Sequence, residues 1–189
     1  MYSLSMTPMK TLLSTLRALA DRERCVFAAS DLAGAVPLSG VGSDQMAVLL
    51  SRAVTAGELK RVCRGIYYYP VSGYRQENLL FHTAARLRAG ELNYLSLETV
   101  LSDEGVISQV PMNWITLMSS GRSHVVDCGE YGRIEFVHTA QRAEDLQGEL
   151  AYDGERRLWR ASVRQALRDL RVTRRSKDLI NEEMANEFV

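Results

Sequence analysis

The chain has 189 residues, 46% of them apolar, and its 23 Lys and Arg balance 23 Asp and Glu. That length suits one large domain or two small ones with a buried core. No apolar run approaches the roughly 18 residues of a membrane span, and no long apolar stretch follows Lys10, so we expect neither a membrane segment nor a signal peptide. Cys25, Cys63 and Cys128 lack any zinc spacing, which predicts a reduced, cytoplasmic protein without cofactors.

The charge is unevenly spread along the chain. Residues 1–75 carry nine Lys and Arg against five Asp and Glu, a net +4, so the rest carries fourteen against eighteen, a net −4. A basic first part joined to an acidic second part suits a DNA-binding module followed by another domain. We expect domains at residues 1–72 and 73–189.

The N-terminal region predicts three helices and three short strands. Thr7-Pro8 begins a helix that runs to about Ala20, and residues 25–27 form a small strand that could join a hairpin. A short helix follows Ser30-Asp31 and ends before Pro37, and the link to the next helix is rich in Gly and Ser.

The third helix begins at Ser43 and leads directly into a hairpin. Its apolar stripe consists of Met46, Leu49, Leu50, Ala53 and Val54. We expect Ser43 or Asp44 to cap its start and Gly57 to end it. Residues 59–63 and 66–69 then read as strands around an Arg64-Gly65 turn. This order of elements is typical of a winged helix-turn-helix.

A winged helix-turn-helix would place one helix in the major groove and its hairpin on the backbone. The candidate DNA contacts are Ser39, Ser43, Asp44, Gln45, Arg52, Lys60, Arg61 and Arg64. The polar residues at the start of the third helix would reach base edges. The basic residues would neutralise phosphates. Taken singly, each charge also fits an ordinary solvated surface.

The second part predicts a small mixed α/β domain, which gives an α+β fold class overall. We expect helices at 77–89 and 97–104, strands at 114–118, 124–127 and 133–139, and a long basic helix from 151 to about 177. Five arginines of that helix recur at helical spacing: Arg160, Arg164, Arg168, Arg171 and Arg175. This stripe would bind nucleic acid or an acidic protein, or be relieved by Asp169 and neighbouring acids.

The segments GELKRVCRGIYYYP, YLSLETVLSDEGVISQVP, WITLMSSGR and GRIEFVHT occur in the order seen in AbiEi-type antitoxins, and residues 8–140 resemble that family. The family belongs to type IV toxin–antitoxin and phage-exclusion (abortive infection) systems. The resemblance implies an autorepressor whose winged domain binds inverted repeats upstream of its own operon, as a monomer or weak dimer that is cooperative on DNA. It implies a C-terminal domain that counteracts a nucleotidyltransferase-like toxin. The basic helix matches no family motif.

Two other classes of function remain open. A winged-helix assembly module would capture an acidic partner through the basic helix. A metal-dependent nuclease would use Asp127 and Glu135 with His124 and His138 nearby. No HxH or HExxH spacing and no phosphate-binding glycine motif is present, so we expect no enzyme and no metal site.

Overall fold

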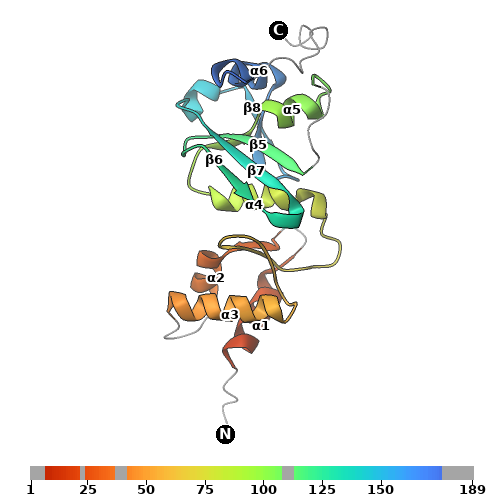
Figure 1. The fold of residues 1–189 in the computed structure, drawn as a ribbon, viewed down its shortest axis with the longest axis vertical. Coiled ribbons are helices and arrows are strands. Elements are labelled where there is room, and N and C mark those ends of the chain that lie inside the picture. Colours follow the sequence, from red (N-terminus) through yellow and green to blue (C-terminus); the bar gives the residue numbers. More distant parts are fainter. Residues whose placement is uncertain (1–6, 22–23, 37–41, 108–112, 176–189) are drawn as a thin grey trace. The chain divides into compact units, whose positions relative to one another are not determined.

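The computed structural model describes residues 7–21, 24–36, 42–107 and 113–175, which form six α-helices and two β-sheets (Figure 1). The expected α+β class is confirmed. The chain divides into two compact units, Met1–Leu79 and Leu80–Val189, called unit 1 and unit 2 below. Composition had placed the boundary at residue 72.

Unit 1 follows the order helix, strand, helix, helix, strand, strand. Its elements are α1 (Pro8–Leu19), β1 (Val26–Ala28), α2 (Ala29–Ala35), α3 (Ser43–Thr55), β2 (Lys60–Cys63) and β3 (Ile66–Tyr68), followed by the 3-10 turn η1 (Gln76–Asn78). β3 lies between β1 and β2 in a three-stranded antiparallel sheet. The predicted start of α1 is confirmed, because Thr7 Oγ1 accepts a bond from the Lys10 N–H at 3.4 Å.

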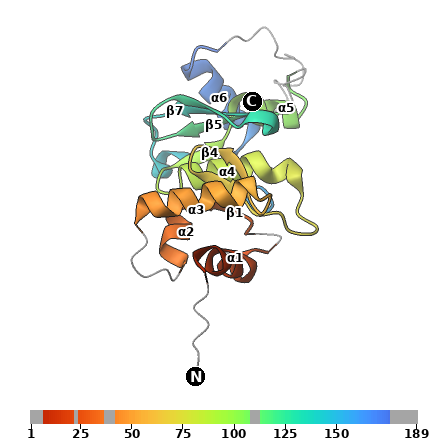
Figure 2. The same ribbon diagram turned by 60° about the horizontal axis from the view of Figure 1, so that its bottom comes forward.

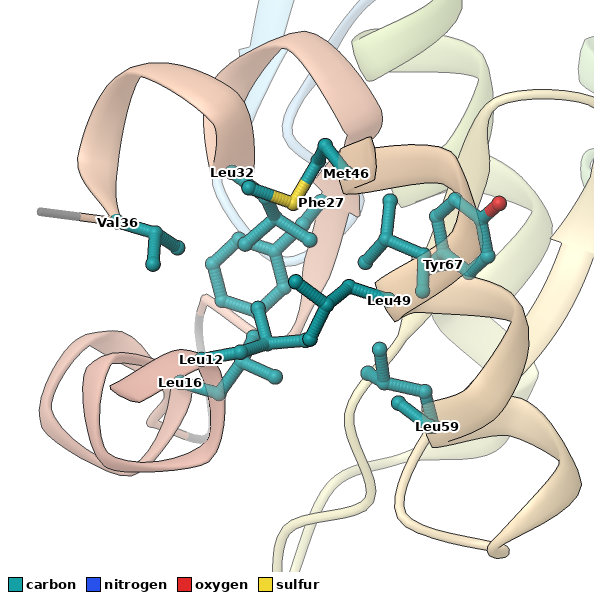
Figure 3. Packing of buried hydrophobic residues seen from close by; sticks show 11 residues of the cluster. Leu12, Leu16, Phe27, Leu32, Val36, Met46, Leu49, Leu59 and Tyr67 are labelled. Atoms are coloured by element: carbon teal, nitrogen blue, oxygen red, sulfur yellow. The ribbon is translucent and has the colours of Figure 1, made fainter. Parts of the chain in front are cut away.

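One hydrophobic core joins the helices of unit 1 to its sheet (Figure 3). The apolar stripe of α3 packs in this core with residues of the other helices and of the sheet. Leu50 and Ala53 of the stripe are fully buried. The other members include Leu12, Leu16, Phe27, Leu32, Val36, Leu59 and Tyr67. Burial of this stripe fixes which face of α3 points outward.

The end of α3 leads into the hairpin through a tight turn. The Gly57 N–H bonds Val54 O and the Glu58 N–H bonds Ala53 O, both at 3.0 Å, which is the Schellman arrangement. Gly57 takes φ +76°, as predicted for a left-handed cap. Gly65 takes φ +79° between β2 and β3, so the expected two-residue turn is confirmed.

Unit 2 is a six-stranded mixed sheet with helices on both faces (Figures 1 and 2). Its elements are α4 (Leu79–Leu87), β4 (Asn93–Leu95), α5 (Leu97–Asp103), β5 (Trp114–Ser119), β6 (His124–Asp127), η2 (Gly129–Tyr131), β7 (Arg133–His138), η3 (Ala143–Leu146), β8 (Leu150–Asp153), β9 (Leu158–Ala161) and α6 (Val163–Val172). The strand order is β6-β7-β5-β4-β9-β8, with β5–β7 and β4–β9 parallel. α4 covers one face, and α5 and α6 cover the other.

The predicted long helix from residue 151 to 177 is wrong. Residues 150–161 form the β8–β9 hairpin, and α6 covers only Val163–Val172. Asp153 Oδ1 accepts backbone bonds from Glu155 at 3.0 Å and Arg156 at 2.9 Å, which closes a turn. The helix-like spacing of Arg160 and Arg164 therefore spans a strand end and a helix start.

A buried carboxylate ties α6 to the sheet in unit 2. Asp169 is fully buried and accepts four hydrogen bonds: from Tyr94 at 3.1 Å, Ser96 at 2.6 Å, Gln141 at 3.0 Å and Gln165 at 2.8 Å. Burial nevertheless raises the pKa of Asp169 above its ordinary value, because desolvation outweighs these donors. The network therefore positions α6 against the sheet. Burial of the charged carboxylate nevertheless lowers the stability of the fold when Asp169 is ionised.

Asp169→Ala should lower the free energy of unfolding by about 3 kcal/mol, since it removes the shared acceptor of four hydrogen bonds in the interior of unit 2. Asp169→Asn should cost less, because the hydroxyls of Tyr94 and Ser96 can turn to accept from the new amide. Urea unfolding of both variants measures the difference.

The pH dependence of Asp169→Asn gives an independent test of the same carboxylate. A raised folded pKa means that the stabilising contribution of Asp169 is fully present below its ordinary pKa and is lost as pH rises through the folded pKa. Asp169→Asn should therefore become more stable relative to wild type as pH rises across that window. A stability difference that stays constant with pH would contradict the raised pKa.

Candidate nucleic-acid interface

The outward face of α3 carries a short row of polar and apolar side chains. Asp44, Gln45, Val48 and Arg52 are all exposed and occupy the face opposite the buried stripe. Val48 is 51% exposed, so an apolar side chain lies on this face among the polar ones. The periodicity of α3 predicted this face, but not the role of Val48, because an apolar residue gave no polar signal.

These side chains border a hollow between α3 and the first turn of α1. The hollow has a volume of about 500 Å³ and is lined by Thr7, Pro8, Met9, Asp44, Gln45, Val48, Leu49 and Arg52. It brings Gln45 and Arg52 onto one continuous surface with the N-terminal end of α1. A partner that contacts the middle of α3 would therefore also meet Thr7 and Pro8.

The hairpin adds three exposed basic residues directly after α3. Lys60 and Arg61 lie on β2, and Arg64 lies at the β2–β3 turn. Arg61 Nε donates to Cys63 O at 3.3 Å, which holds that guanidinium along the strand. Among the described residues no carboxylate forms an ion pair with Lys60 or Arg64, so these charges face solvent.

The structure corrects the predicted cap of α3. Gly42 occupies the N-cap position and makes no side-chain capping bond, so neither Ser43 nor Asp44 acts as the cap. Glycine is among the residues that occur readily at the N-cap position. Ser39 lies outside the described residues, and Ser43 is placed only as the first residue of α3.

The five arginines predicted on one helical face do not share one. Arg160 lies on β9 and binds Glu104 at 2.6 Å, whereas Arg175 follows α6 and binds Glu98 at 2.8 Å and also Glu135. Both arginines are about one-quarter exposed. These two guanidinium groups are therefore engaged within unit 2.

The other three arginines form the exposed face of α6. Arg164 and Arg168 both approach Glu149 Oε1, at 2.5 and 3.3 Å, yet their side chains stay 55% and 54% exposed. The Ser162 hydroxyl donates to Glu149 at 2.5 Å, and this bond, together with both arginines, lowers the pKa of Glu149. Arg171 is exposed, with no ion pair to another described residue. The single carboxylate of Glu149 therefore forms ion pairs with two of the three exposed arginines of α6.

The acidic residues considered for metal binding have other partners. Asp127 Oδ1 accepts the Gly129 N–H at 2.8 Å, and Glu135 binds Arg175 and Trp114. Within the described ranges, no three His, Cys, Asp or Glu side chains are grouped to hold a metal ion. None of the helices described is long and apolar enough to span a bilayer. Comparison of the sequence with protein-family models and with curated proteins gives no match.

Arg175→Ala should lower the free energy of unfolding by about 2 kcal/mol, because it strips two half-buried carboxylates of their shared partner. Arg171→Ala should change it by less than about 0.5 kcal/mol, as is usual for an exposed side chain. Unfolding of the two variants in guanidinium chloride measures both free energies, and the substitution, arginine to alanine, is the same in each. Equal losses would contradict the division between paired and exposed arginines.

Proposed function

We propose that unit 1 is a winged helix-turn-helix that binds double-stranded DNA, and that the protein represses its own operon. The observation that carries this proposal is the exposed face of α3 continuing into a hairpin with unpaired basic residues. α3 has 13 residues and is about 20 Å long at 1.5 Å per residue, which suits the major groove. Lys60, Arg61 and Arg64 would then meet phosphates on the flanking backbone.

Four exposed side chains of α3 have a chemical counterpart on a base edge. The Gln45 amide can donate to and accept from adenine, and Arg52 can bind guanine or a phosphate. Asp44 can accept from the amino group of cytosine, and Val48 can contact the methyl group of thymine. All four side chains lie on the outward face of α3, because Leu49 and Leu50 on its other side are buried in the core.

The resemblance of residues 8–140 to AbiEi-type antitoxins supports a wider role for this DNA binding. We propose a cytoplasmic antitoxin that binds inverted repeats upstream of its own gene and counteracts a nucleotidyltransferase-like toxin. Unit 2 would carry the antitoxin activity in that case. The second candidate is an assembly module for an acidic partner, favoured by the three exposed arginines of α6.

Arg64→Ala and Arg52→Ala should each weaken binding to the DNA just upstream of the gene by about tenfold, as expected for the loss of one contact. Each should also reduce the slope of log affinity against log salt by about one, if the residue meets a phosphate. Mobility shifts at several salt concentrations measure both quantities.

Arg171→Ala is the matched control for these two variants, since it removes the same charge from unit 2. It should leave the affinity and the salt slope unchanged. Wild-type protein that binds a scrambled duplex as tightly as the upstream DNA would contradict the repressor proposal. Unchanged affinity in both unit 1 variants would remove Arg52 and Arg64 from the interface.

Val48 allows a test of base contact without any charge change. Single thymine-to-uracil replacements in the bound DNA remove one methyl group, and one position should weaken wild-type binding about fourfold, the effect of burying one methyl. Val48→Ala should bind the thymine and uracil forms equally. If the variant keeps the full sensitivity to uracil, Val48 does not read that methyl group.

A further inference from the structure

The hollow between α3 and the first turn of α1 has a mostly apolar surface, and the proposed DNA contacts use only Val48 among its apolar side chains. Pro8, Met9 and Leu49 also line it, and Val48 itself is 51% exposed. The DNA backbone is charged, so it does not pair with these side chains. A contiguous apolar hollow on a surface often marks a contact with another segment or molecule.

The charged side chains at this hollow cancel. Asp44 and Arg52 are the two charged residues among the described ones that line it. Its other polar groups are the Gln45 amide and the Thr7 hydroxyl, which already accepts the Lys10 N–H at 3.4 Å. An uncharged, apolar occupant would therefore fill the hollow without burying an unpaired charge.

Residues 1–6, called the arm below, join the described chain at the rim of this hollow. Thr7 lines the hollow and directly follows the arm, and its own backbone is extended, with φ −63° and ψ 149°. Six extended residues span about 20 Å. The hollow extends along α3 from Asp44 to Arg52, about 12 Å at 1.5 Å per residue. The arm is therefore long enough to cross it.

The arm has the composition and the pattern that suit an apolar hollow. Its sequence, MYSLSM, contains four apolar residues and no charged one. Tyr2, Leu4 and Met6 alternate with Ser3 and Ser5, and alternate residues of an extended chain point to the same side. An arm that continues the extended backbone of Thr7 can thus turn three apolar side chains to the hollow and two hydroxyls to solvent.

We propose that the arm covers this hollow in the DNA-free protein, with Leu4 and Met6 against Val48, and that DNA displaces it. The tether holds the arm at an effective concentration on the order of mM, so even weak apolar contacts keep it in place. The contact hides the exposed side chain of Val48 from water and adds no charge to the surface.

Such an arm would regulate the DNA-binding face of α3. Gln45 and Arg52, which we propose as base contacts, border the hollow that the arm covers. The arm and DNA therefore exclude each other, and DNA binds only to molecules whose arm is displaced. This regulatory part rests on the proposed function, whereas the docking of the arm does not.

Nuclear Overhauser effects between methyl groups test the docking in the full chain without DNA, with Leu, Val and Met methyl groups labelled. Cross-peaks should join Leu4 or Met6 to Val48. Leu4→Ser should weaken those of Met6, because it removes the central apolar contact of the arm. Ser5→Ala, on the opposite side of the arm, should leave them unchanged. The absence of any cross-peak between the arm and the hollow would overturn the proposal.

Mobility shifts of the same two variants with the DNA upstream of the gene test the displacement. Leu4→Ser should tighten binding by about tenfold for an arm that covers the hollow in about nine-tenths of the molecules. Ser5→Ala should leave the affinity unchanged. Neither variant alters the charge of the arm, so repulsion between the arm and DNA is the same in both.

The two measurements separate the docked arm from the proposed function. Cross-peaks without any change of DNA affinity in Leu4→Ser would mean that the arm docks without excluding DNA, which overturns the regulatory part. A wild-type protein with no preference for the upstream DNA would contradict the proposed function and the regulation together. The cross-peaks would still decide whether the arm covers the hollow.

Discussion

The burial of the apolar stripe of α3 determines what unit 1 presents to a partner. Leu50 and Ala53 are fully buried against the other helices and the sheet, so α3 cannot rotate without exposing them. The opposite side chains are consequently fixed in solvent as a row. The Schellman turn at Gly57 then directs the chain into β2, so the basic hairpin directly follows the exposed row of α3. Packing, rather than any polar contact, thus arranges the proposed DNA-binding surface.

The basic residues Arg160 and Arg175 of unit 2 have different surroundings from Lys60 and Arg64 of the hairpin. In unit 2, Arg160 pairs with a carboxylate at the C-terminal end of α5, and Arg175 pairs with one carboxylate of α5 and one of β7. These ion pairs stabilise the packing of the helices and the sheet. In unit 1, Lys60 and Arg64 have no such described partner. An unpaired cation is available to neutralise a phosphate without first breaking an ion pair, which favours the hairpin over β9 as a nucleic-acid contact.

The sequence predicted elements well where periodicity and turn residues agreed, as in α1, α3 and the hairpin around Gly65. It failed from residue 151 to 161 because arginines at helical spacing concealed the turn that Asp153 closes. β4 has three residues, too few for a periodic signal. Three donors to Asp169, from Tyr94, Ser96 and Gln141, lie 28 to 75 residues before it, so only the fold brings them to the carboxylate, whereas Gln165 is one helical turn away. The face of α3 was predictable, whereas the exposure of Val48 depends on tertiary packing.

A cleavage reagent attached to α3 would test most directly whether this helix enters the major groove. The three native cysteines are buried, so Gln45→Cys offers a selectively reactive thiol for an iron–EDTA label. The labelled protein should cut the DNA upstream of its gene at discrete positions within each half of an inverted repeat. The same label on Arg171→Cys should give no such cuts. Uniform cutting, or the same pattern from both labels, would contradict DNA recognition by α3.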